Sequence, residues 1–322
     1  MNEKEIKTEF KKISVVIPLY NESESLEELY EKVIESFGNI SADFEIIFVD
    51  DGSTDNSFVI ISLLKEKDNR VKVIRFLSNS GKADALQAGF EASKGDCIIT
   101  MDADLQDDPA EIPALLKALE KGYDMVSGWK RNRHDPVSKT LPSKFFNMIV
   151  RIFSGMRLHD FNCGLKAYRR EVADSIKIYG ELHRYIPVLA KHQGFRVGEI
   201  PVKHHPRKHG HSKYGIRRFI EGFLDLMTII LLTRYTKKPL HLFGSVGLLF
   251  CFAGGLVNLF IVALWIQSGF HNIQGRQPLL VGGVFLFLLG VQFISTGLLA
   301  ELITHSRMEK NRNYRIDNSS GI

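Results

Sequence analysis

The stretch Gly95–Pro109, GDCIITMDADLQDDP, joins a short apolar run to a cluster of carboxylates. The run Cys97–Met101 has the length and the Ile content of a buried strand, so Asp102 and Asp104 follow directly at a predicted strand end. Two carboxylates one residue apart at such a point can bind one hard divalent cation, Mg²⁺ or Mn²⁺, and that cation can bridge a diphosphate. The alternative is a solvent-exposed acidic turn.

The same alternation of strand and helix continues on both sides of this stretch. Predicted strands are Ile13–Ile17, Phe44–Val49, Val71–Phe76, Cys97–Met101, Met125–Trp129 and one near Arg196–Val202. Predicted helices are Ser23–Phe37 with Ser23 as N-cap, Asp55–Lys67, Lys82–Ser93 and Pro109–Lys121. This order predicts an α/β fold with a mainly parallel, Rossmann-like sheet covered by helices on both faces. Ligands of such sheets bind beyond the carboxyl ends of the strands.

Two further strand ends carry polar residues. The first strand leads into Pro18-Leu19-Tyr20-Asn21-Glu22, and the second ends in Asp50-Asp51-Gly52-Ser53. The chain has neither the GxGxxG of a dinucleotide fold nor a GxxxxGK[ST] loop, which disfavours an oxidoreductase and a P-loop ATPase. The carboxylates of the second strand end can accept hydrogen bonds from a ribose or a base, although Asp-Gly-Ser is also an ordinary turn.

The last quarter of the chain differs sharply in composition from the rest. Between Leu240 and Thr304 the only Lys, Arg, Asp or Glu residues are Arg276 and Glu301, whereas the whole chain is 25% charged with a net charge of +5. The apolar segments 240–265 and 278–304 each exceed the roughly 20 residues that span a bilayer. Basic residues flank their outer ends, which predicts that both termini lie in the cytosol. Their glycines would let the two spans pack on each other or on a second subunit, giving a homo-oligomer.

A basic, amphipathic stretch precedes the first span. Residues 215–236 place apolar side chains at helical spacing, which predicts a helix in the membrane interface; the alternative is a helix packed on the soluble core. We therefore expect a tail (1–12), a cytosolic α/β domain (13–214), this interfacial helix (215–236), two transmembrane helices (237–304) and a second tail (305–322). Nucleic acid is a poor partner for the basic stretch, because it adjoins a membrane span and lacks a platform of stacking aromatics.

These motifs, in this order, resemble the family 2 inverting glycosyltransferases of the GT-A fold over roughly Ile13–Tyr214. Asp102–Gln106 is most similar to the polyprenyl-phosphate glycosyltransferases, such as bacterial bactoprenol glucosyltransferases and dolichol-phosphate mannose synthase. The resemblance implies donor-binding residues, with a nucleoside held by Pro18, Tyr20, Glu22, Asp50 and Asp51. It also implies that Asp102, Asp104 and Gln106 hold Mg²⁺ or Mn²⁺ and the donor diphosphate, with Lys82 beside the donor.

Three later segments complete the resemblance. Ser127–Arg133 is similar to a phosphate-contacting loop, with Arg131 and Arg133 as its cations. Asp160 corresponds to an acid on the acceptor side, and it remains open whether it is a base, a metal contact or an arginine partner. Arg207, Ser212 and Lys213 lie in a segment that the family uses for a lipid phosphate, to which arginine offers a planar fork and lysine a point charge.

The implied reaction moves a hexose, with UDP-glucose as the expected nucleotide sugar, to undecaprenyl phosphate in the bacterial cytoplasmic (inner) membrane. The product would feed a cell-envelope polysaccharide. One alternative is a processive polysaccharide synthase of the same fold, although Gln193-Gly194-Phe195-Arg196 is followed by Val197 instead of the expected tryptophan. Another is a non-catalytic membrane adaptor on the same scaffold.

Overall fold

The computed structural model describes residues 6–131, 147–152, 154–180, 182–206, 238–268 and 275–308. The chain divides into two compact units, Met1–Ile229 and Ile230–Ile322, and each is considered by itself. The predicted interfacial helix, residues 215–236, and the boundary before it lie outside the described residues. That part of the domain division therefore stays a prediction.

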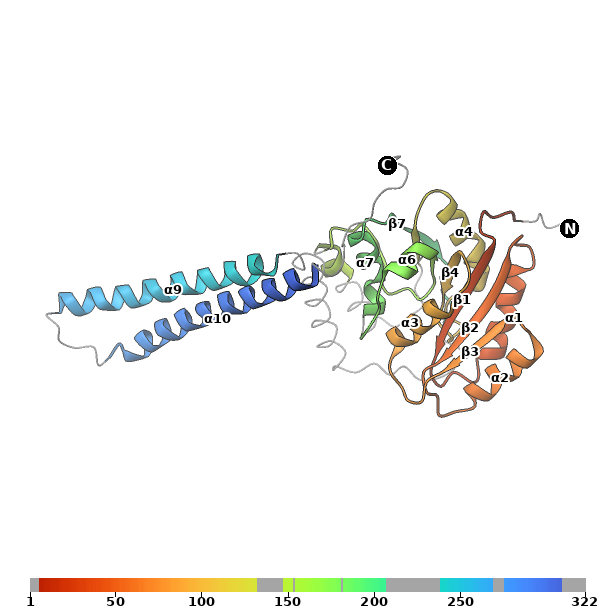
Figure 1. Ribbon diagram of the computed structural model, residues 1–322, viewed down its shortest axis with the longest axis horizontal. Helices are drawn as coiled ribbons and strands as arrows, with labels where there is room; N and C mark the ends of the chain where they lie inside the picture. Colours follow the sequence, from red (N-terminus) through yellow and green to blue (C-terminus); the bar gives the residue numbers. More distant parts are fainter. Residues whose placement is uncertain are drawn as a thin grey trace. The chain divides into compact units, whose positions relative to one another are not determined.

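In the described part of the first unit, seven strands form one sheet in the order β3-β2-β1-β4-β6-β5-β7 (Figure 1). The strands are β1 (Lys12–Leu19), β2 (Asp43–Asp50), β3 (Val71–Arg75), β4 (Cys97–Thr100), β5 (Met125–Lys130), β6 (Lys166–Arg169) and β7 (Val197–Val202). Every neighbouring pair is parallel except the two pairs made by β6, which runs antiparallel to β4 and β5. The predicted, mainly parallel sheet is confirmed.

Helices cover both faces of this sheet, as predicted. They are α1 (Leu26–Phe37), α2 (Ser57–Lys67), α3 (Lys82–Ala92), η1 (Pro109–Glu111), α4 (Ile112–Glu120), α6 (Arg170–Ser175), η2 (Leu182–Tyr185) and α7 (Ile186–His192). Alternate residues of β1, such as Val15, join a core with Leu29 of α1 and Leu115 of α4. Val16 faces α3 on the other side, where a Cβ added to Gly89 would lie 2.2 Å from Val16 Cγ1.

The start of α1 differs from the prediction, because Ser25 and not Ser23 occupies the N-cap position. The Ser25 hydroxyl donates to the carbonyls of Glu22 at 2.9 Å and Ala103 at 2.7 Å. The backbone N–H of Glu22 in turn donates to Ser57 Oγ at 3.0 Å. The loop after β1 is thus held on one side by α2 and on the other by the segment after β4, so the helix begins later than the sequence pattern suggests.

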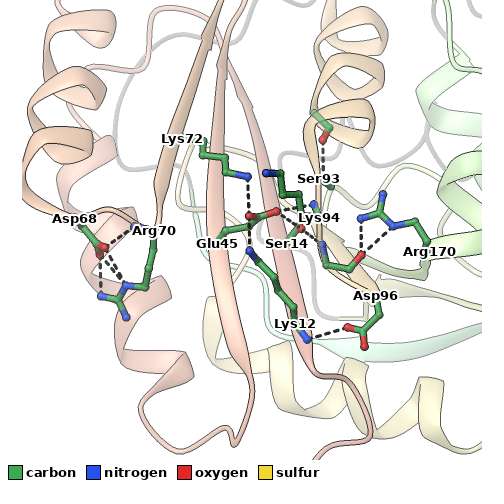
Figure 2. A network of polar contacts seen from close by, with 12 residues as sticks. Lys12, Ser14, Glu45, Asp68, Arg70, Lys72, Ser93, Lys94, Asp96 and Arg170 are labelled. Atoms are coloured by element: carbon green, nitrogen blue, oxygen red, sulfur yellow. Dashed lines mark hydrogen bonds and ion pairs between the residues drawn. The ribbon is translucent and has the colours of Figure 1, made fainter.

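A buried carboxylate, that of Glu45, joins β1 and β2 (Figure 2). It lies well before the carboxyl ends of these strands, where the sequence motifs are found. Glu45 Oε2 lies 3.0 Å from Lys12 Nζ and 2.8 Å from Lys72 Nζ. Glu45 Oε1 accepts hydrogen bonds from Ser14 Oγ and the Lys94 N–H, both at 2.7 Å. Burial alone would raise the pKa of Glu45, but the bonds from Lys72, Lys94, Ser14 and Lys12 reverse this effect and lower it to about 2.

The described part of the second unit is a pair of long helices, α9 (Pro239–Gln267) and α10 (Gln277–Met308). Both are long and apolar enough to cross a membrane, with most of their side chains exposed. They approach closely at glycines: a Cβ on Gly247 would lie 2.7 Å from the Gly290 carbonyl oxygen, and one on Gly254 would lie 2.6 Å from that of Gly283. The predicted pair of apolar helices is confirmed.

One of the two charged residues of the apolar region has a clear structural partner. The Glu301 carboxylate accepts a hydrogen bond from the Leu240 N–H at 3.1 Å. This N–H is in the first turn of α9, where no intrahelical acceptor exists. The carboxylate therefore stabilises the start of one helix of the pair from near the end of the other.

Candidate active site

A cavity of about 290 Å³ lies where the carboxyl ends of β1, β2 and β4 meet. Its lining includes the predicted residues Pro18, Tyr20, Glu22, Asp51, Lys82, Asp102 and Asp104, together with Leu19, Asn79, Gly81, Ala85 and Ala103, which sequence reasoning did not single out. Its size is close to the lower end of the range for small-molecule sites. We call it the donor cleft.

Asp50 and Asp51 have different surroundings, although they are adjacent. Asp51 lines the donor cleft and accepts hydrogen bonds from the Ser80 N–H at 2.7 Å and the Gly81 N–H at 2.9 Å. Burial raises its pKa, and these two bonds only partly offset the effect. Asp50 is fully buried, accepts from the Ser53 N–H at 2.9 Å and is not among the lining residues. Asp50 therefore stabilises the turn after β2, and Asp51 is the carboxylate that lines the donor cleft.

The position of the Asp102 side chain depends on an ion pair with a lysine and on the close approach of a glycine. Its carboxylate pairs with Lys82 Nζ from the first turn of α3. A Cβ on Gly164 would lie 2.5 Å from Asp102 Cγ, so only a residue without a side chain allows this close approach. Burial alone would raise the pKa of Asp102, but the charges of Lys82 and Lys130 hold it well below its usual range.

Asp104 completes the pair and suits a metal ion. Burial and then the negative charges of Asp102 and Asp107 raise the pKa of Asp104, so a cation beside it would relieve like-charge repulsion. Among the described residues no group of three or more His, Cys, Asp or Glu side chains is arranged to hold a metal. The chain thus offers two carboxylates, and a bound diphosphate would supply further oxygens, as is usual for Mg²⁺.

The segment Asp102–Asp108, which we call the acid loop, is paired with the chain that leads into the predicted lipid-phosphate segment. Asp107 and His204 form an antiparallel bridge, and the His205 N–H donates to the Gln106 carbonyl at 2.9 Å. The His205 ring lies 3.1 Å from the Asp108 carboxylate. Gln106 therefore serves this pairing with its backbone and is not among the residues that line the donor cleft.

A buried ion pair connects the acid loop to β5. Lys130 Nζ lies 3.0 Å from Asp107 Oδ1, and both side chains are largely buried. Burial alone would lower the pKa of Lys130, but the charge of Asp107 more than compensates and raises it. Arg131, the next residue, is exposed, with its guanidinium 5.8 Å from the Trp129 ring centroid. The predicted residues Arg133, Arg207, Ser212 and Lys213 lie outside the described residues.

Asp160 reaches this edge because β6 is antiparallel. The residues before an antiparallel strand lie at the same edge as the residues after its parallel neighbours. Asp160 is buried and accepts a hydrogen bond from the Asn162 N–H at 3.0 Å. This placement leaves its predicted roles on the acceptor side open.

Sequence reasoning missed a second, smaller cavity behind Asp102. It has a volume of about 10 Å³ and is lined by Lys82, Leu86, Thr100, Met101, Asp102, Asn162, Cys163, Gly164, Lys166, Tyr168, His183 and Ile186. We call it the recess. Its polar residues come from β4, β6, α3 and η2, and no local motif unites them, so only the three-dimensional structure brings them together.

Comparisons with known proteins identify a family and relatives that match over most of the chain. The family described as Glycosyl transferase family 2 matches residues 14–177. Dodecaprenyl-phosphate galacturonate synthase of Rhizobium johnstonii is 38% identical over 310 residues, which are 94% of this chain and 91% of that protein. Undecaprenyl-phosphate 4-deoxy-4-formamido-L-arabinose transferase of Proteus mirabilis is 38% identical over 293 residues, 91% of this chain and 88% of that protein.

Solved structures share the fold. Glucosyl-3-phosphoglycerate synthase from Mycobacterium tuberculosis, in complex with Mn²⁺ and UDP-glucose, superposes with a TM-score of 0.52 at 20% identity, over 69% of this chain and 79% of that chain. The same enzyme in complex with phosphoglyceric acid gives a TM-score of 0.52 over 69% and 80%. This similarity concerns the fold alone.

Proposed function

The chain belongs to glycosyl transferase family 2, and from that premise we propose that it transfers a hexose from a UDP-linked donor to a membrane polyprenyl phosphate. Undecaprenyl phosphate is the proposed acceptor. The two curated relatives are named for galacturonate and for 4-deoxy-4-formamido-L-arabinose, and both act on polyprenyl phosphates. Glucose, the sugar expected from the sequence, is one candidate among the hexoses.

The observation that carries this proposal is the pairing of the acid loop with residues 204–205. A transfer between two anions needs the donor diphosphate and the acceptor phosphate side by side. The hydrogen bond from His205 to Gln106 brings the start of the basic segment against the acid loop. Arg207 follows His205 by two residues in the sequence, which supports assigning the acceptor phosphate to the segment that begins there.

On the donor side, we assign the nucleoside to Tyr20, Glu22 and Asp51, which line one cavity. Asp102 and Asp104 would hold Mg²⁺ or Mn²⁺, which would neutralise the charge that develops on the leaving diphosphate. Lys82 lies in the same cleft and adds a positive charge next to Asp102. A preorganised cation of this kind stabilises a developing anion without reorganisation at the moment of reaction.

On the acceptor side, an oxygen of the lipid phosphate attacks the anomeric carbon. The new carbon–oxygen bond forms as the bond to the diphosphate breaks, and the electron pair leaves with UDP, which inverts the configuration. A phosphate monoester has a second pKa of about 6 and is mostly dianionic in the cytosol, so no base is required. In this proposal Asp160 positions a cationic side chain such as that of Lys130, whose pKa its negative charge helps to raise.

We further propose that α9 and α10 anchor the enzyme in the bacterial cytoplasmic membrane, with both termini and the α/β domain in the cytosol. Two exposed apolar spans within these helices, Pro239–Gln267 of 29 residues and Gln277–Thr304 of 28, support this placement. The domain limits 13–214, 215–236 and 237–304 remain part of this proposal. A homo-oligomer formed through these helices is part of the same proposal.

Membranes that contain the protein should transfer label from a nucleotide sugar to an extractable lipid, and Asp104→Asn should abolish this transfer. Asp43→Asn, an exposed residue at the start of β2, is the matched control and should keep full activity. Both variants should show the wild-type unfolding transition. Arg207→Ala should raise the KM for the lipid more than the KM for the donor. Full turnover by Asp104→Asn would refute the metal assignment, and an unchanged lipid KM would refute that of Arg207.

A further inference from the structure

The recess adjoins the donor cleft, and the two cavities share Lys82 and Asp102 in their walls. Its volume of about 10 Å³ is enough for one water-sized group. A group bound to the atoms of the donor cleft could therefore extend a small substituent into the recess. The side chains that line the recess determine which substituent it accepts.

Lys166 places a buried positive charge in the wall of this recess. Its residue is only 5% exposed, and its Nζ donates one hydrogen bond, to the Cys163 carbonyl. Among the described residues, no carboxylate oxygen lies within 4.0 Å of Lys166 Nζ, the limit for an ion pair. Asp102 and Asp160 act on Lys166 only from longer range. An ammonium group has three donors, and a buried charge is costly unless it is paired.

His183 adds a second unsatisfied polar group. It is 8% exposed, and its Nδ1 is buried without a hydrogen-bond partner among the described residues. An imidazole ring carries at least one N–H in either protonation state, so His183 can donate a hydrogen bond to a group in the recess. Asp102 acts on Lys166 only at longer range, and its ion pair is with Lys82.

We propose that the recess binds a carboxylate carried by the transferred sugar, so that the preferred donor is a nucleotide-linked uronic acid. This inference rests on the proposed function and narrows its substrate class. The recess has room for one carboxylate oxygen. Lys166 supplies the positive charge, and His183 is placed to donate a hydrogen bond to the same oxygen.

The first experiment compares donors with the wild-type full-length protein in lipid nanodiscs containing undecaprenyl phosphate. The donors are UDP-glucuronate and UDP-galacturonate against UDP-glucose and UDP-galactose, with Mn²⁺ present. We expect kcat/KM for at least one uronate to exceed that for its neutral counterpart by on the order of 10- to 100-fold, the effect of a hydrogen bond to a charged group. Equal use of neutral and acidic sugars would overturn the proposal.

The second experiment uses Lys166→Met and, as a matched control, Lys191→Met. Lys191 Nζ also donates to one backbone carbonyl, that of Gly155, but it is exposed and lies outside both cavities. Lys166→Met should lower the ratio of kcat/KM for the uronate to kcat/KM for the neutral sugar by at least about tenfold, whereas the control should leave this ratio unchanged. His183→Phe serves as a second variant if Lys166→Met does not fold, and the same loss of preference is expected.

Binding of UDP alone and the KM for the lipid identify the anion. If Lys166→Met weakens UDP or lipid phosphate as much as it weakens the uronate, the recess binds a phosphate and the proposal is wrong. If no sugar of any kind reaches the lipid, the proposed function fails. If neutral sugars are transferred without any preference for acidic ones, the proposed function stands and only the carboxylate subsite is refuted.

Discussion

The buried carboxylate of Glu45 offers a quantitative test of the fold. Its pKa is lowered from 4.5 to about 2 by the bonds that outweigh its burial. At about 1.4 kcal/mol for each tenfold change in proton affinity, this difference contributes about 3 kcal/mol to stability at pH 7. Glu45→Gln keeps the size of the side chain but removes its charge, so we expect the variant to lose about that amount.

The pH dependence has a definite sign. Because the pKa of Glu45 is lower in the folded state, its contribution is complete above pH 4.5 and disappears as the pH falls towards 2. Between pH 7 and pH 3 the difference in unfolding free energy between wild type and Glu45→Gln should therefore shrink by about 2 kcal/mol. Urea unfolding of the full chain in detergent micelles, followed by tryptophan fluorescence, measures the unfolding free energies of wild type and variant at pH 7 and at pH 3.

Glu9→Gln is the matched control. Glu9 pairs with Arg169 at 2.6 Å, but its side chain is 48% exposed, so its loss should cost less than about 1 kcal/mol. A difference for Glu45→Gln that stays constant from pH 7 to pH 3, or that equals the control at pH 7, would refute this account. The donor KM should not change, since Glu45 does not line the donor cleft.

Three further substitutions test other contacts. Lys130→Met leaves Asp107 buried and unpaired, so unfolding free energy should fall by about 3–5 kcal/mol; a loss below 1 kcal/mol would contradict the buried ion pair. Gly164→Ala forces a methyl group into the acid loop, so Mn²⁺ binding, measured by electron paramagnetic resonance, should weaken while the unfolding transition remains; unchanged binding would argue against this contact. Gly290→Leu should separate α9 from α10 and lower the melting temperature in detergent, whereas Gly282→Leu, whose Cβ would meet no atom within 4 Å, should not.

The sequence was sufficient for those parts of the fold that depend on local pattern. Strands such as Lys12–Leu19 and Asp43–Asp50 consist mostly of apolar residues because both faces of the sheet are covered, and such stretches are visible without a structure. The residues after them could be assigned to one edge because parallel strands all end on the same side. Most of the predicted donor residues consequently line a single cavity.

What the sequence did not indicate depends on long-range pairing. The strand β6 is only KAYR, and its first residue is a lysine that lines the recess, so it has no apolar pattern. The bond between His205 and Gln106 joins residues almost one hundred positions apart, and nothing local in either segment specifies it. The same holds for His183, an inconspicuous residue in sequence whose burial gives it significance.

Asp102 lines both the donor cleft and the recess. A cation on one side of this carboxylate and a sugar substituent on the other would each alter the electrostatic potential that the other experiences. Thermodynamic linkage requires such an influence to be mutual, so a sugar that tightens metal binding is itself bound more tightly when the metal is present. The metal concentration that half-saturates the enzyme would then be a property of the sugar as much as of the protein.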